Sequence, residues 1–301
     1  MRGARPDDSC SQFPIPPFSS SFTIMPSDSP STPPSLAPAE GWHVLHLFYH
    51  IEHAQWDLLS ADEQIRAKTN LTRLVQEIRA TPQTQLLVFS MLTPKADLGF
   101  MLLTPDLHTA NAFEKKLTLS LGTDVLAPAY SYLSMTEWTE YVVTDEEQSA
   151  KIASEKGFQP GTPEHAAEME TFHKHMAKYR QDRLYPNMPD WPVFCFYGMS
   201  KRRNDGNNWY ALPFPDRRKL MGGHAITGRK YHGRVRQLIT GSTGLDEYEW
   251  GVTLFSHTTS DIKAIVYEMR FDEVSARFAE FGDFYIGIQL PLDELFQRVL
   301  L

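Results

Sequence analysis

The sequence has few of the features that mark whole classes of proteins. It contains only two cysteines, Cys10 and Cys195, so a disulfide scaffold is excluded and a reducing, cytoplasmic compartment is expected. No run approaches the roughly 18 apolar residues of a membrane-spanning helix. Acidic residues outnumber basic ones, 37 to 29, and the net charge of −8 argues against general nucleic-acid binding. Neither a phosphate-binding glycine loop nor a nucleophile elbow is found.

The first 40 residues differ in composition from the rest of the 301-residue chain. They hold nine Pro and nine Ser, in runs such as SPSTPPS. Such a segment buries too little apolar surface to offset the entropy of ordering it, so we predict a disordered tail. A secretion or transit signal is the alternative, but the tail has no apolar core and carries acidic residues among its basic ones.

Hydrophobic periodicity predicts alternating strands and helices from residue 41 onward. The strand-like runs are 43–51, 85–92, 97–104, 130–143, 191–200, 235–242, 249–257 and 284–290, and helices are expected at 53–80, 105–120, 163–183, 213–232 and 259–278. The polar stretch 150–160 contains glycine and proline, which predicts a connection.

The order β-α-β-β-α-β therefore occurs twice, which predicts an α+β fold of two tandem ferredoxin-like units. We expect antiparallel sheets that pack face to face, with helices outside. The predicted divisions are a tail at 1–40, an N-terminal unit at 41–150, a helical connection at 151–190 and a C-terminal unit at 191–301.

The charge is distributed unevenly along the chain. Ten basic residues lie between Lys201 and Arg236, opposed only by Asp205 and Asp216, so this stretch is +8 in an acidic protein. A solvated basic face is the simpler interpretation. A binding site for a polyanion is the other, because guanidinium groups bind carboxylates by paired hydrogen bonds. Aromatic and apolar residues are interleaved with the charges, which favours a large, flat, apolar ligand that carries several carboxylates.

The same stretch contains His224, in the segment KLMGGHAITGRKY. Gly222 and Gly223 precede it and Gly228 follows, and residues without a Cβ let a bulky planar group approach the backbone closely. A lone histidine is more often structural than a ligand, so this pattern carries little weight by itself.

Four segments of the C-terminal half resemble the coproheme decarboxylases of the chlorite dismutase superfamily. They are FCFYGMSKRR (194–203), NNWYALPF (207–214), 224–255 and 265–287. The resemblance covers about 110 residues in order. It implies a dimeric α+β barrel and a peroxide-dependent enzyme that converts two propionates of iron coproporphyrin III to vinyl groups, giving protoheme b.

The resemblance also implies roles for individual residues. His224 matches the histidine that binds the iron, Tyr197 the tyrosine that becomes a radical, and Lys201 the lysine beside the reacting propionates. The implied contacts to the porphyrin are Arg183, Met199, Arg229, Gln237, Arg270, Ser275 and, from the first half, Tyr132. Where the family has the sequence Tyr-Pro-Met, this chain has Tyr197-Gly198-Met199.

Two other activities remain open within the resemblance. A chlorite dismutase or haem peroxidase would be favoured by an arginine at the position of Gln237, and a carrier or sensor by loss of Tyr197 or Lys201. The resemblance further implies coproheme and hydrogen peroxide as ligands, transient contact with a coproporphyrin ferrochelatase, and a homopentamer.

Overall fold

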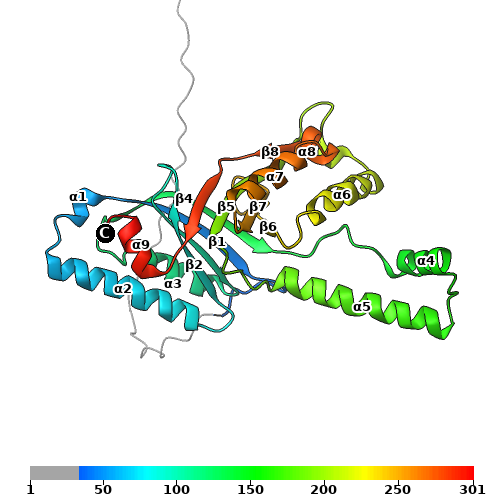
Figure 1. Ribbon diagram of the computed structural model, residues 1–301, viewed down its shortest axis with the longest axis horizontal. Helices are drawn as coiled ribbons and strands as arrows, with labels where there is room; N and C mark the ends of the chain where they lie inside the picture. Colours follow the sequence, from blue (N-terminus) through cyan, green and yellow to red (C-terminus); the bar gives the residue numbers. More distant parts are fainter. Residues whose placement is uncertain (1–33) are drawn as a thin grey trace, which may run out of the picture. The chain divides into compact units, whose positions relative to one another are not determined.

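The strand-forming runs pair into one antiparallel sheet in the computed structural model, which describes residues 34–301 (Figure 1). The strands are β1 (His43–Ile51), β2 (Gln85–Met91), β3 (Leu98–Thr104), β4 (Leu126–Thr136), β5 (Val193–Lys201), β6 (Val235–Gly241), β7 (Trp250–Ser256), β8 (Ala279–Phe281) and β9 (Tyr285–Gln289). The helices are α1 (His53–Trp56), α2 (Ala61–Ala80), α3 (Leu107–Thr118), α4 (Asp145–Lys156), α5 (Pro163–Leu184), α6 (Phe214–Arg229), α7 (Thr259–Met269), α8 (Glu273–Phe278) and α9 (Leu292–Arg298), with the short 3₁₀ turn η1 (Trp209–Ala211). The predicted disordered tail covers residues 1–40, of which residues 1–33 lie outside the described part.

Each half of the sheet has the strand order of a ferredoxin-like unit. The first half runs β4-β1-β3-β2 and the second β6-β7-β5-β9. The halves join where β4 pairs with β6 and where β2 pairs with β9. Because β5 pairs with both β7 and β9, the sheet closes on itself as a barrel. The predicted tandem ferredoxin-like α+β fold is thus confirmed, with one continuous sheet instead of two stacked ones.

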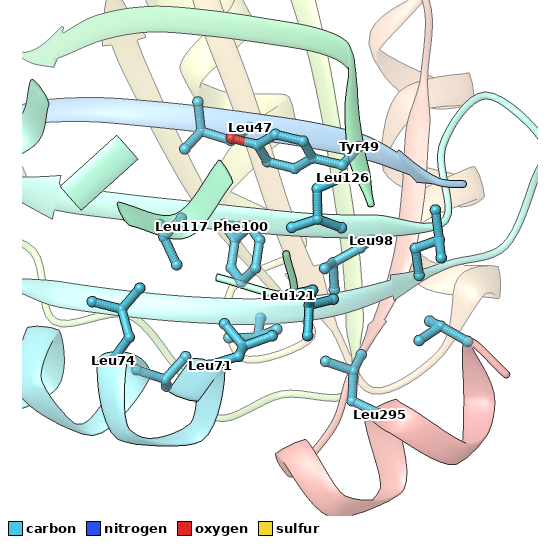
Figure 2. Close-up of a cluster of buried hydrophobic side chains, with 14 of the residues drawn as sticks. Leu47, Tyr49, Leu71, Leu74, Leu98, Phe100, Leu117, Leu121, Leu126 and Leu295 are labelled. Atoms are coloured by element: carbon cyan, nitrogen blue, oxygen red, sulfur yellow. The ribbon is translucent and has the colours of Figure 1, made fainter. Parts of the chain in front are cut away.

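Closure divides every strand into inward and outward side chains, because successive residues of a strand point to opposite faces. On β5, Phe194 and Phe196 belong to the cluster inside the barrel. Cys195 and Tyr197 belong to a different cluster, on the outer face of the C-terminal half. The outer face of the N-terminal half is covered by α2, α3 and α9, whose leucines pack around Phe100 (Figure 2).

The structure corrects four sequence-based boundaries. The expected connection at 150–160 is largely helix α4, which begins at a capping box formed by Thr144 and Glu147. The expected strand at 130–143 is β4, which ends at Thr136. Its further alternating residues instead contact α6, where Tyr141 stacks on Phe214. The single helix expected at 259–278 is broken into α7 and α8, and the one expected at 53–80 is broken into α1 and α2.

Within residues 34–301, every helix is too short or too polar to span a lipid bilayer.

Replacement of Phe89 by alanine tests the aromatic interior of the barrel. Phe89 is fully buried and stacks on Phe194 with a centroid distance of 3.9 Å. We expect Phe89→Ala to lower the free energy of unfolding by about 3–5 kcal/mol, because it leaves a cavity that the closed sheet cannot fill. Leu58→Ala, at a side chain that is 78% exposed, is the control and should change it by less than about 0.5 kcal/mol. Urea unfolding of both variants measures the difference.

Candidate functional site

The outer face of β5 carries three of the residues singled out from the sequence. Tyr197, Met199 and Lys201 alternate along the strand and therefore share this face. Tyr197 packs with residues of β7 and α7, and Lys201 is buried at the end of the strand. A phenol, a thioether and an ammonium thus lie in a row on a largely apolar surface.

Helix α6 presents His224 on the same half of the barrel. The helix packs against α7 and α8, yet none of its side chains is fully buried. Leu220 and Met221 anchor it against the cluster around Trp209. A Cβ added at Gly222 or Gly223 would meet no atom within 4 Å, so the backbone beside His224 borders open space.

His224 makes a hydrogen bond that fixes its tautomer. Its Nδ1 lies 3.0 Å from Oδ2 of Asp272. An ionised carboxylate can only accept, so Nδ1 carries the proton and Nε2 is left as the basic nitrogen. No hydrogen bond to Nε2 is formed by any residue between 34 and 301. The imidazole is therefore oriented by one nitrogen and available through the other, as in a metal-binding histidine.

Asp272 is itself held by the start of α8. Its Oδ1 accepts from the backbone of Val274 and Ser275, and its Oδ2 accepts from the Ser275 hydroxyl at 3.0 Å. Burial raises the pKa of Asp272, but the bonds from His224 and Ser275 outweigh it and leave the pKa below its usual value. The carboxylate stays ionised and rigid beside the imidazole.

Lys201 lies between two carboxylates. Burial lowers the pKa of its ammonium to about 8, against the opposing influence of Asp272 and Glu249. The backbone N–H of Lys201 donates to Oε2 of Glu249 at 2.7 Å, and the Nζ lies 4.7 Å from the centre of the Trp209 ring. The negative charge of Asp272, which binds His224, thus also acts on the ammonium of Lys201.

Tyr197 is enclosed by aromatic rings from the end of β8 and from the turn between β8 and β9. It stacks on Phe284 at 4.4 Å and contacts Phe281 at 5.7 Å. Arg270, which follows α7, lies 3.8 Å over the Phe281 ring and is otherwise exposed. Burial raises the pKa of Tyr197, so this side chain is a neutral phenol at physiological pH.

Gln237 and Arg229 lie at the side of the site nearest the end of α6. Gln237, on β6, pairs in register with Leu254 and faces outward, and its Nε2 would lie 3.4 Å from a Cβ at Gly228. Arg229, the last residue of α6, is exposed.

Arg183 is at the rim of the site, not in its centre. It is one residue before the end of α5, and its Nε donates to the Glu137 carbonyl at 2.9 Å. The Glu137 carboxylate accepts from the indole N–H of Trp250, and Trp250 is the cross-strand neighbour of Met199. A chain of contacts thus links Arg183 to the outer face of β5.

Tyr132 lies away from these residues. It is fully buried in the barrel interior, where its ring contacts Phe196, and its hydroxyl donates to the Tyr248 carbonyl at 3.0 Å. It also lines a cavity of about 280 Å³ beside β1 and β4. The structure does not bring Tyr132 to the cluster on the outer face.

Most basic side chains of the stretch 201–236 form ion pairs with carboxylates that lie elsewhere in the sequence. Arg217 and Arg218 contact Glu140 and Glu147, and Lys230 and Arg234 contact Glu268 and Asp261. Arg202 and Arg203 contact Glu280 and Glu249. The sequence pattern therefore overstates the number of cations that face the site.

Asp272 and Glu249 are the site residues that the sequence interpretation missed. Asp272 is 48 residues from His224 in the sequence, so no local motif joins the two. The one sign of its role is its position at the break between α7 and α8. The acidic residues around Glu249 are typical of a solvated loop, but the Glu249 side chain is only 9% exposed.

Comparisons with known proteins agree with this architecture. The family model for chlorite dismutase matches residues 64–290. A haem-binding protein from Thermus thermophilus is 36% identical to this chain. The match covers 89% of this chain and 98% of that protein, with a TM-score of 0.72. The chlorite dismutase of Candidatus Nitrospira defluvii in complex with imidazole is 17% identical to this chain. The match covers 88% of this chain and 97% of that protein, with a TM-score of 0.65. The latter similarity concerns the fold.

The lowered pKa of Lys201 predicts a pH-dependent stability. Between about pH 8 and the ordinary lysine value of 10.5, Lys201 binds more proton in the unfolded chain, so its own contribution to stability rises with pH by up to about 1.4 kcal/mol per pH unit. The raised pKa values of Cys195 and Tyr197 contribute with the opposite sign in the upper part of this range. Below pH 8 both states are protonated, and the cost of the buried ammonium is present in full. Lys201→Met should therefore have a lower slope of stability against pH than the wild type, and Lys219→Met, at an exposed position of α6, should keep the wild-type slope. Urea unfolding at several pH values compares the three proteins, and an unchanged slope in Lys201→Met would contradict the assignment.

Proposed function

Because this chain belongs to the chlorite dismutase family, we propose that its C-terminal half, residues 191–301, binds an iron porphyrin and acts on it. The residues present fit such a group. Nε2 of His224 is the free nitrogen of an imidazole that Asp272 orients, and it borders the open space beside Gly222 and Gly223. The relative that is 36% identical is a haem-binding protein.

We propose in particular that the substrate is iron coproporphyrin III and that the product is protoheme b. The bound iron supplies the redox chemistry by which hydrogen peroxide oxidises the site. The observation that carries the proposal is the placement of Tyr197 and Lys201 on one strand face of the half that presents His224. A phenol that can lose a hydrogen atom and an ammonium that can hold a carboxylate are the two groups this reaction needs.

The side chains divide the chemistry between them. His224 holds the iron, and Asp272 keeps the imidazole in one tautomer. Lys201 binds a propionate, and with a pKa of about 8 its ammonium can also give up a proton. Tyr197 gives up its hydroxyl hydrogen and then takes a hydrogen from the propionate β-carbon. Loss of carbon dioxide and one more electron leaves a vinyl group, so each vinyl uses one two-electron oxidant, and peroxide is reduced to water.

The other predicted contacts complete the pocket in this proposal. Ser275, Arg270 and Arg229 hold propionates, Arg183 does so from the rim, and Met199 packs on the porphyrin edge. Gln237 faces the same side of the sheet as Leu254. An uncharged amide there favours peroxide over chlorite as oxidant, since an anion would gain from an arginine.

We also propose a cytoplasmic, homo-oligomeric enzyme that receives its substrate from a coproporphyrin ferrochelatase. The free and buried thiol of Cys195 agrees with a reducing compartment. A pentamer is the assembly that the resemblance implies, and the mass of the purified protein in solution tests it.

Addition of peroxide to the protein loaded with iron coproporphyrin III tests the reaction. We expect the porphyrin to lose carbon dioxide twice in succession, and mass spectrometry of the porphyrin measures both losses. Tyr197→Phe should slow vinyl formation by about 10²-fold or more, since it removes the reacting hydrogen but keeps the ring. Tyr132→Phe is the matched control and should react normally. Native rates in Tyr197→Phe would refute the radical role. Bleaching without mass loss would indicate a peroxidase, and binding alone a carrier or sensor.

Replacement of Asp272 by asparagine tests the orientation of His224. Asparagine preserves the cap of α8 but removes the charge that polarises the imidazole. We expect the affinity for iron coproporphyrin III to fall by about 10–100-fold, measured by absorbance titration of the apoprotein. Asp261→Asn, which removes a carboxylate from the start of α7, should bind normally. Equal affinity of both variants would mean that Asp272 serves only as a helix cap.

A further inference from the structure

Tyr248 lies against the strand that carries Tyr197, in a cradle made by two glycines. A Cβ at Gly198 would lie 2.3 Å from Cδ2 of Tyr248, and a Cβ at Gly282 would lie 2.6 Å from its Cζ. Real Cβ atoms do not approach so closely, so the Tyr248 ring needs glycine at both positions.

The turn between β8 and β9 touches both tyrosines. Its Phe281 and Phe284 pack on Tyr197, and its Gly282 packs on Tyr248. The backbone N–H of Gly282 donates to the Gly198 carbonyl at 2.8 Å, which fixes the turn to β5. Because neighbouring residues of a strand point to opposite faces, Tyr197 and Gly198 face opposite sides, and the Tyr248 ring packs on the face of β5 opposite to Tyr197.

The surroundings of Tyr248 favour loss of an electron. Its side chain is half-buried, in contrast to the buried Tyr197, so its ring reaches the surface. Burial raises the pKa of Tyr248, and the negative charges of Glu247, Asp283 and Glu280 raise it further. The same charges stabilise the positive charge that develops as an electron leaves the ring.

We propose that Tyr248 is a second oxidation site, at which an oxidising equivalent on Tyr197 leaves the buried site for the surface. Tyr248 loses one electron and its hydroxyl proton, which passes to water or a neighbouring carboxylate. Tyr197 gains the electron and recovers its proton, and so returns to the phenol. The oxidant is hydrogen peroxide, as in the proposed function, on which this inference rests. When no propionate is left to react, this path diverts oxidation from the porphyrin to the surface ring of Tyr248, and so protects the porphyrin.

The test maps oxidised peptides after excess peroxide is added to the protein loaded with iron porphyrin. We expect oxygen addition or dityrosine at Tyr248 in the wild type, and none in Tyr197→Phe. Tyr248→Phe keeps the packed ring and loses only the hydroxyl. It should form vinyl groups at the native initial rate but lose its porphyrin absorbance several-fold faster. Tyr267→Phe, at a tyrosine that is 65% exposed on α7, is the matched control and should behave as the wild type.

The outcomes separate this inference from the proposed function. Vinyl formation with an unmodified Tyr248 overturns the inference and leaves the function. Modification of Tyr248 that needs Tyr197, without vinyl formation, supports the inference and refutes the function. Oxidation at the buried thiol of Cys195 in place of Tyr248 overturns the inference, because the thiol shares the outer face of β5 with Tyr197 and is the competing donor. If Tyr248 is modified to the same extent in Tyr197→Phe as in the wild type, the inference is also overturned.

Discussion

The double pairing of β5 is the constraint on which the rest of the structure depends. Because this strand bonds to both β7 and β9, it closes the barrel and has no free edge along most of its length. Closure fixes which residues point in and which point out, so Phe194 and Phe196 fill the interior while Tyr197 and Lys201 face α7 and α8. A slip of one residue would exchange the two sets, and so the packed interior also guarantees the position of the reacting side chains.

Electrostatic pairing then decides which cations remain for a ligand. The arginines at the start of α6 are bound to Glu140 and to Glu147, and Glu147 also caps α4, so the charge at this end of the helix serves to hold it in place. Within the basic stretch 201–236, all of which the structure describes, Lys201 is the one buried cation. Its neighbours Asp272 and Glu249 reduce the cost of burying its charge, and the same carboxylates keep anions away unless an anion binds strongly enough to compete.

The sequence predicted the fold well where periodicity is strong and the site only in part. The run 43–51 is strand β1 at its full length, and the polar helix beginning at Pro163 is α5. Helix α4 was missed because it has little apolar surface, although the spacing of Thr144 and Glu147 marks its start. The partnership of His224 with Asp272 joins residues 48 positions apart through the packing of α6 on α8, and no local pattern encodes that packing. Similarly, the alternation of Tyr132 along its strand does not show which face is the interior of the barrel.

Gly198 affects both the strand that carries Tyr197 and the packing on the opposite face of that strand. From the sequence alone, glycine in place of proline only loosens the strand beside Tyr197. In the structure, Gly198 pairs with Gly251 of β7, and on the other side its carbonyl accepts a hydrogen bond from the backbone N–H of Gly282, so β5 is held at this position. What the missing Cβ provides is room, and the Tyr248 ring occupies it. Gly198 therefore matters less for the placement of Tyr197 than for the opposite face of β5, where it leaves room for the oxidisable ring of Tyr248.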